Sequence, residues 1–165
     1  MASMDQLMVI NEQYQLSKVM AMNDRIMGAT GRHLVLSSED ARIIIQEKRK
    51  ILKELKLVEL GESILPRLHY EFFDCGYIQQ REYKDALIRL QELFFTYREE
   101  LRTYVTDDEL LNFMREQFDE GCKGDFDLLE GRLQDLAQAI RNGYRGYHNS
   151  EGKGIWKEVE DYIGI

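Results

Sequence analysis

Apolar residues recur at steps of three and four positions along most of the chain, which is the period of an amphipathic helix. The most regular stripe lies in residues 79–104, where the steps approach the 3.5-residue period of a coiled-coil seam. Its members are Tyr83, Leu87, Leu90, Phe94, Tyr97, Leu101 and Tyr104. Further apolar residues flank this seam, so we predict that 79–104 is the central helix of a bundle. The same seam would also serve a homodimer, and the sequence leaves that alternative open.

Glycine, proline and capping residues separate the stripes in the first half of the chain. A first helix is predicted over 5–27, because glycines follow it directly. Ser37 and Ser38 precede acidic residues, which is typical of the start of a second helix. Pro66 is tolerated only near a helix start and therefore opens a short third helix that ends near Phe73.

Two strong caps mark helices in the second half. Thr106 and Glu109 have the spacing of a capping box, which predicts a fifth helix to about residue 120. Asp125 precedes a further apolar stripe and is predicted to cap a sixth helix. Four of the twelve glycines fall in 143–154, which we predict to be a loop, and 155–163 could form one last short helix.

Composition supports an all-α fold. The chain has one proline in 165 residues, whereas sheet proteins use prolines in their many turns. Hydrophobic residues make up 44% and charged residues 32%, as in a folded domain. We therefore predict a single helical domain over 1–165, a bundle of about six helices, in which residues 1–3 are typical of a cloning scar.

Charge excludes some partners. The net charge is −8, and residues 83–165 hold 11 basic and 18 acidic side chains. A protein of this charge is expected to bind neither nucleic acid nor an anionic membrane surface through non-specific attraction. Ten acids between 107 and 135 are predicted to be solvated helix faces, although a basic partner or mimicry of a nucleic acid would also suit them.

Two features of the first sixty residues could belong either to the structure or to a binding surface. A basic cluster of Lys48, Arg49, Lys50, Lys53 and Lys56 occupies the predicted second helix. We predict an exposed face there, even though Lys48 interrupts the apolar stripe, and the alternative is a site for phosphate or an acidic partner. Six of the seven methionines lie at or before residue 27, and they are predicted to fill gaps in the core, with an adaptable binding surface as the alternative.

The chain lacks the usual signatures of cofactor and metal chemistry. Cys75 and Cys122 stand 47 residues apart without a Cys-x-x-Cys pair, and no Glu-x-x-His or phosphate-binding loop occurs. We therefore predict that the protein holds no metal and no cofactor and that its thiols are reduced. A non-enzymatic function is favoured over an enzymatic one. No apolar run approaches the 18 or so residues of a membrane span, and no signal-peptide pattern opens the chain, which together predict a cytoplasmic protein without a membrane partner.

A few polar and aromatic side chains are candidates for a pocket or interface, because they stand beside apolar helix positions or in the glycine-rich segment. They are His69, Cys75, Tyr77, Tyr97, Tyr144, Tyr147 and His148. The function that fits best is a non-catalytic cytosolic protein-interaction or adaptor module. The alternative is a small-molecule-binding protein or enzyme with a pocket between helices. Convergence of the candidates on one deep pocket would favour the alternative, whereas an uncovered apolar groove would favour an interaction module.

Several short motifs follow one another in a recognisable order. They are Gly61-Glu62-Ser63-Ile64-Leu65-Pro66, Phe73-Asp74, Tyr77-Ile78, Asp107-Asp108-Glu109-Leu110 and Gly121-Cys122-Lys123-Gly124. In this order the chain resembles a family of small uncharacterised bacterial helical proteins over residues 40–142. The resemblance implies a bacterial cytosolic origin, and it transfers no functional residue because the family has no assigned function.

Overall fold

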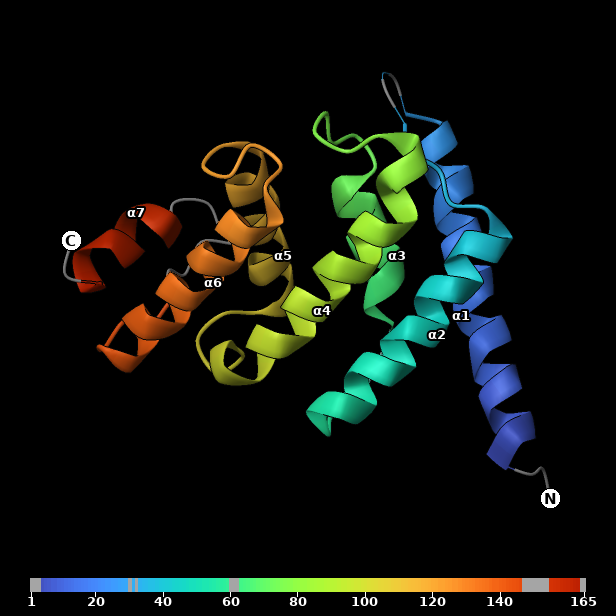
Figure 1. Cartoon of the computed structure of the whole chain (residues 1–165), viewed down its shortest axis with the longest axis horizontal. Helices are drawn as coiled ribbons and strands as arrows, with labels where there is room; N and C mark the ends of the chain where they lie inside the picture. The colour runs from blue at the N-terminus through green and yellow to red at the C-terminus, as the bar shows by residue number, and fades with distance from the viewer. Residues whose placement is uncertain (1–3, 30, 32, 60–62, 147–154, 164–165) are drawn as a thin grey trace. The chain divides into compact units, whose positions relative to one another are not determined.

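The chain is helical throughout its regular structure. A computed structural model describes residues 4–29, 31, 33–59, 63–146 and 155–163. These residues form seven α-helices, two 3₁₀ turns and no strand, so the predicted all-α bundle is confirmed. The residues group into two compact units, Met1–Glu92 and Leu93–Ile165, and the long helix α4 contributes to both (Figure 1).

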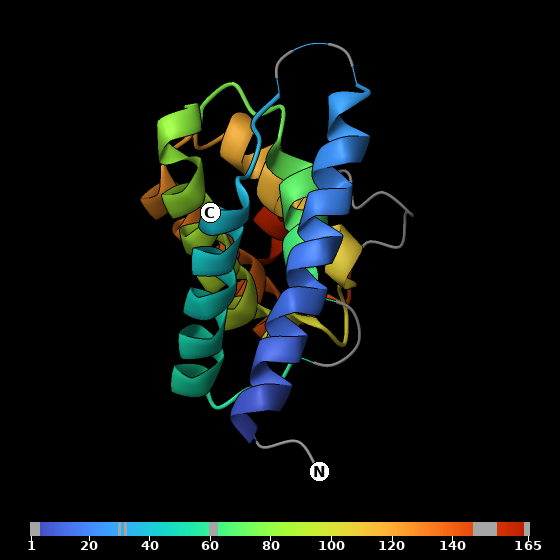
Figure 2. The ribbon, with the colours of Figure 1, turned by 90° about the vertical axis from the view of Figure 1, so that its right-hand side faces the viewer.

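The first unit is built around three helices and the beginning of a fourth. Its elements are α1 (Met4–Met27), α2 (Ser38–Leu55), α3 (Ile64–Phe72), the 3₁₀ turn η1 (Gln80–Glu82) and the first half of α4 (Tyr83–Leu101). The first two helices run antiparallel, and α1 also packs along α3 (Figures 1 and 2). Both α2 and α3 therefore pack against α1.

The helix starts of this unit follow the capping residues. The Ser37 hydroxyl accepts the backbone N–H of Asp40 at 3.1 Å, which caps α2 as predicted. The extended segment before it is also held in place, since the Leu34 N–H donates to the Phe73 carbonyl at 2.7 Å. The side-chain amide of Gln80 pairs with both backbone polar groups of Val35 at 2.8 and 2.9 Å. The connection from α1 to α2 is therefore fastened to the chain that follows α3.

The second unit contains the rest of α4, then α5 (Asp107–Asp119), α6 (Phe126–Arg141), α7 (Ile155–Val159) and the 3₁₀ turn η2 (Glu160–Tyr162). The predicted capping box is present, with Glu109 N–H to Thr106 Oγ1 at 3.1 Å and Thr106 N–H to Glu109 Oε1 at 3.0 Å. Asp125 caps α6 by accepting two backbone N–H groups at 2.8 and 3.1 Å. Both caps satisfy backbone donors that the first turn leaves without an intrahelical partner.

The central stripe is buried as expected, although its helix is shorter than predicted. Leu87, Leu90, Phe94 and Leu101 are all fully buried. The α-helix begins only at Tyr83, after the turn η1, and ends at Leu101 instead of residue 104. The chain forms a tighter turn after Leu101, because the N–H of Tyr104 donates to the Leu101 carbonyl at 3.0 Å. The α-helix therefore stops early, and Thr106 caps α5 shortly afterwards.

Only residues 143–146 of the predicted loop over 143–154 belong to the described part of the chain. Gly143 and Gly146 have φ angles of 112° and 89°, in the region that favours glycine, and residues 147–154 lie outside the described part of the chain. Residues 1–3 also lie outside it, so the suggested cloning scar stays a prediction. The single-domain organisation stays a prediction as well.

Candidate binding groove

The candidate residues chosen from the sequence are dispersed between the two units. His69 and Cys75 are fully buried in the first unit, and Tyr77 is 50% exposed there. Tyr97 and Tyr144 belong to the second unit. Tyr147 and His148 lie outside the described residues. None of the described candidates lines either of two hollows that lie beside α1.

His69 has a structural environment. Its Nδ1 lies 2.6 Å from the Tyr83 hydroxyl, and its Nε2 lies 2.8 Å from Asn23 Oδ1. The Asn23 amide nitrogen donates to the Leu36 carbonyl at 2.6 Å, so its Oδ1 is the acceptor and His69 Nε2 carries the proton. Burial lowers the pKa of His69 from 6.5 to about 4. This neutral, doubly bonded imidazole ties α3 to α1 and α4.

Tyr144 also has an assigned partner. Its hydroxyl donates to Glu158 Oε2 at 3.1 Å, and its ring lies 5.5 Å from that of Tyr162. The side chain is buried, and burial followed by the hydrogen bond to Glu158 raises the pKa of the Tyr144 phenol above its ordinary value of 10. Tyr144 therefore secures the C-terminal helical segment to the end of α6.

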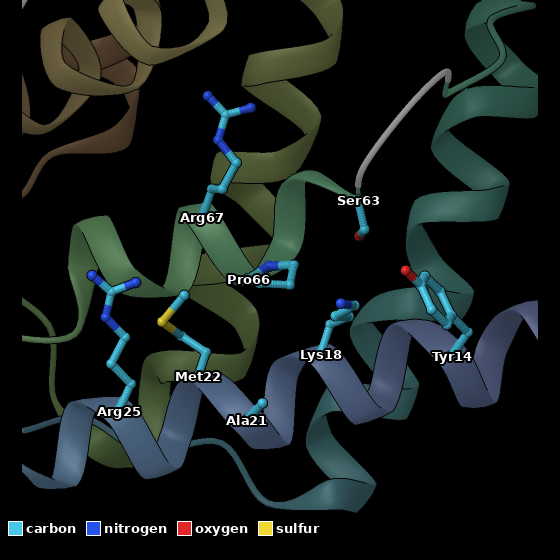
Figure 3. A pocket seen from close by; sticks show the side chains of 8 residues that line it. All are labelled: Tyr14, Lys18, Ala21, Met22, Arg25, Ser63, Pro66 and Arg67. Carbon is cyan, nitrogen blue, oxygen red and sulfur yellow. The ribbon is translucent and has the colours of Figure 1, made fainter.

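The hollows of interest lie on the first unit, beside α1. The first, of about 460 Å³, is enclosed by α1 and α3 (Figure 3). Its lining residues are Tyr14, Lys18, Ala21, Met22, Arg25, Ser63, Pro66 and Arg67. The second, also about 460 Å³, lies between α1 and the C-terminal part of α2, with Leu57, Val58 and Glu59 on its edge. Because Tyr14 and Ser63 line both hollows, we describe the two together as the α1 groove.

The side chains of α1 face α3 across the first hollow. Figure 3 shows Met22 pointing from α1 toward Pro66, with Arg25 and Lys18 on either side of it. Arg67 follows Pro66 on α3, and in this view its guanidinium points away from α1, while Ser63 caps the start of α3. Met22 is thus half-buried at the groove, and Met27 is 64% exposed, so filling the core is not the role of Met27.

Lys48 forms the floor of the second hollow and is 2% exposed. Its ammonium donates to Glu59 Oε1 at 2.7 Å, to Ser63 Oγ at 3.1 Å and to Gln15 Oε1. Glu59 uses its other oxygen to accept the Ile64 N–H at 2.9 Å, at the start of α3. This polar cluster joins α1, α2 and the beginning of α3.

The prediction of an exposed basic face is wrong for Lys48. The residue follows Ile44 by four positions and precedes Ile51 by three, so its side chain leaves α2 on the same face as these buried residues. Burial lowers the pKa of Lys48 below its ordinary value of 10.5, and the attraction of the Glu59 carboxylate opposes that shift. An isolated buried ammonium would be costly, and the three oxygen partners compensate for the lost water.

Positive charge dominates the lining of the groove. Its six cationic side chains are Lys18, Arg25, Lys48, Arg49, Lys53 and Arg67, and Glu59 is the one acidic residue among the described lining residues. Glu59 neutralises Lys48, while Glu12 pairs with Arg49 at 2.6 Å. Within the described part of the chain, Lys18, Arg25 and Lys53 form no salt bridge.

Comparison with known proteins identifies a family. A model of DUF6323, a family of unknown function, matches residues 18–146. The chain belongs to the DUF6323 family. No curated protein and no solved structure is significantly similar to it. DUF6323 membership confirms the resemblance to an uncharacterised family, and the matched segment includes the part of the α1 groove from Lys18 onward.

Neither a cluster of metal ligands nor a membrane-spanning helix occurs among the described residues. Among the described side chains, no three His, Cys, Asp or Glu residues gather where they could hold a metal ion. No helix in the described ranges combines the length and apolar character that crossing a membrane requires.

The sequence contained one signal for the groove. Lys48 interrupts an otherwise apolar stripe, and a charged residue on an inner helix face needs buried polar partners. Its partners Gln15, Glu59 and Ser63 come from two other segments, and nothing in their local sequence indicates that they meet Lys48. The candidates His69 and Cys75 are instead buried in the core of the first unit.

Proposed function

We propose that the protein is a non-catalytic protein-interaction module whose partner binds in the α1 groove. The observation that carries this proposal is the exposure of large apolar side chains within the groove. Tyr14 is 59% and Val58 is 76% exposed, and both line it. Apolar side chains gathered on an exposed surface and bordered by polar ones are typical of protein-binding sites.

The length of the groove also suits a polypeptide. Its lining residues on α1 extend from Asn11 to Arg25, which is about 21 Å at 1.5 Å per residue. A segment of helix of similar length lying along α1 would contact both hollows. Recognition of a helix in a groove commonly uses apolar anchors that recur every three to four residues.

Binding of a small molecule is the second candidate function. The second hollow favours it, because this hollow by itself has the size of a ligand pocket. Its volume of about 460 Å³ lies within the range of about 300–1,000 Å³ that is common for ligand pockets. Its floor also presents fixed polar groups on Lys48, Gln15 and Ser63. Native mass spectrometry of protein purified under mild conditions distinguishes this case, because a retained small molecule would add a discrete mass that disappears on denaturation.

Site-specific photo-cross-linking in cells of the source organism tests the main proposal. A photoreactive amino acid replaces Ala21, which is exposed in the groove, and the matched control replaces Gln134, which is exposed on α6. We expect a discrete protein adduct from position 21, none from position 134, and loss of the adduct when Tyr14→Ser is introduced. Equal adducts from both positions, or none from position 21, would contradict the proposal.

A cytoplasmic location is part of the same proposal. Among the described residues, Cys75 and Cys122 are buried and form no disulfide, and reduced thiols are usual in a reducing compartment. Fractionation of source cells, with a tagged full chain followed by immunoblotting, is expected to place the protein in the cytosolic fraction. Recovery in a membrane or secreted fraction would contradict this location.

A further inference from the structure

We infer that the α1 groove selects an acidic amphipathic segment of a partner protein, an inference that rests on the proposed function. Such a segment carries carboxylates for the cations of the groove and bulky apolar side chains for its hollows. Two properties of the groove lead to this class of partner. One is the positive charge along its rim that no described residue pairs in a salt bridge, and the other is the arrangement of apolar surface between the cations.

Among the described residues, cations without a salt bridge line both hollows of the groove. Lys18 and Arg25 lie along the first hollow and Lys53 along the second, and all three are exposed. Lys18 lies 5.3 Å from the Tyr14 ring centroid and Arg25 lies 4.7 Å from that of Tyr70. These cation–π contacts hold the side chains in place without neutralising them, so their charges stay available to a carboxylate.

Apolar surface separates these charges. Met22 and Pro66 lie between Arg25 and Lys18 in the first hollow (Figure 3). Val58 and Leu52 line the second hollow together with Lys53. A partner that presented carboxylates alone would leave this surface uncovered, whereas a segment that alternates acidic and bulky apolar residues would satisfy both parts.

The charge of the whole chain argues against larger polyanions. The net charge is −8, so the cations of the groove are a local exception on an acidic protein. At physiological salt, charges are screened beyond about 8 Å, so a short segment within the groove experiences mainly the nearby cations. A nucleic acid or an anionic membrane extends beyond the groove, and the negative net charge of the whole protein repels it. A short acidic segment is therefore the occupant that the charge distribution favours.

Peptide binding by the full chain tests the inference. The probe is a fluorescein-labelled helical peptide that has a stripe of leucines on one face and glutamates elsewhere, and its counterpart carries lysine in place of each glutamate. We expect the acidic peptide to bind at least ten-fold more tightly than the basic one, a difference of about 1.4 kcal/mol. Raising the salt concentration is expected to weaken binding of the acidic peptide, because exposed charges are screened.

Matched variants locate the binding site. Lys18→Gln with Lys53→Gln removes two groove charges, and we expect it to weaken binding about five- to ten-fold, consistent with the usual strength of exposed ion pairs. The control, Arg102→Gln with Lys157→Gln, removes two exposed charges from the second unit and is expected to change binding less than two-fold. Thermal melts of both variants establish that each one is folded.

A second pair of variants tests the apolar contacts. Tyr14→Ser is expected to weaken binding of the acidic peptide at least five-fold, because this ring borders both hollows. The control is Leu128→Ser, which replaces an apolar residue that is 54% exposed on α6 and is expected to leave binding unchanged. Both positions are exposed, so neither substitution removes core packing.

Several results would overturn the inference. Equal binding of the acidic and basic peptides would refute the charge selectivity, and equal losses in the groove and control variants would place the peptide elsewhere. Binding to vesicles of anionic lipid in preference to the peptide would identify a membrane surface instead. Self-association that Lys18→Gln with Lys53→Gln abolishes would identify a second copy of the chain as the occupant. If cross-linking at Ala21 succeeds while the acidic peptide shows no preference, the interaction function stands and only the class of partner is wrong.

Discussion

Protonation of His69 is expected to make the stability of the protein fall steeply in mildly acidic solution. The folded chain keeps this residue neutral because burial lowers the pKa of His69 to about 4, whereas in the unfolded chain the pKa has its ordinary value of 6.5. Between these two values the unfolded state binds a proton that the folded state does not bind. Acid therefore favours unfolding across this interval, and the contribution is absent above it.

The size of the effect follows from the two pKa values. The full difference corresponds to about 3 kcal/mol, since each pKa unit is worth about 1.4 kcal/mol. Integration of the proton uptake gives a loss of about 2 kcal/mol between about pH 7 and pH 5, where few carboxylates titrate. His69 is fully buried, so solvent does not screen this contribution.

Urea unfolding followed by circular dichroism at several pH values measures this loss, and His69→Gln is the decisive variant. Glutamine does not titrate, and it can still accept from Tyr83 and donate to Asn23. We expect its stability to change about 2 kcal/mol less than that of the wild type between about pH 7 and pH 5. Tyr83→Phe is the control that keeps His69 buried, and it should retain the pH dependence at a lower overall stability. An equally steep loss in His69→Gln would refute the reasoning.

Four other substitutions test the fold by chemical denaturation. Leu90→Ala and Phe94→Ala should each destabilise the protein by about 2 to 5 kcal/mol, because both side chains are fully buried, and losses below about 0.5 kcal/mol would place the central stripe on the surface. Thr106→Ala should cost about 1 kcal/mol by removing half of the capping box, whereas an unchanged midpoint would show that the cap is dispensable. Gly146→Ala should cost about 1 to 3 kcal/mol, because φ is 89° and the added Cβ would collide with the Tyr104 carbonyl oxygen. A neutral result there would contradict the close approach.

Local signals in the sequence were sufficient to predict where the helices lie. The capping box of Thr106 and Glu109, the cap at Asp125 and the stripe through Leu90 all act within one or two helical turns, so each could be recognised without knowledge of the fold. The end of α4 was missed because it depends on how the next helix begins, and Tyr104 continues the apolar period beyond the point where the α-helix stops.

The groove could not be predicted because its parts are distant in the sequence. Tyr14 and Ser63 line the same two hollows although 49 positions separate them. Lys48 was assigned to a solvated face because clusters of charge usually lie there, but the geometry of α2 directs this one side chain inward. Reactive side chains were also a poor guide, since His69 is occupied by two hydrogen bonds within the fold.

The hydrogen bonds of Asn23 have a consequence for the evolution of the family. Its carboxamide accepts from His69 and joins the backbone of Leu36, and His69 in turn meets Tyr83. Replacement of one of these side chains alone would leave a buried polar group without its partner, which is more costly than replacing the set together. Positions 23, 69 and 83 all lie within the segment shared with DUF6323. Selection should therefore make these three positions covary among its members, with lineages that lose the histidine also losing the asparagine.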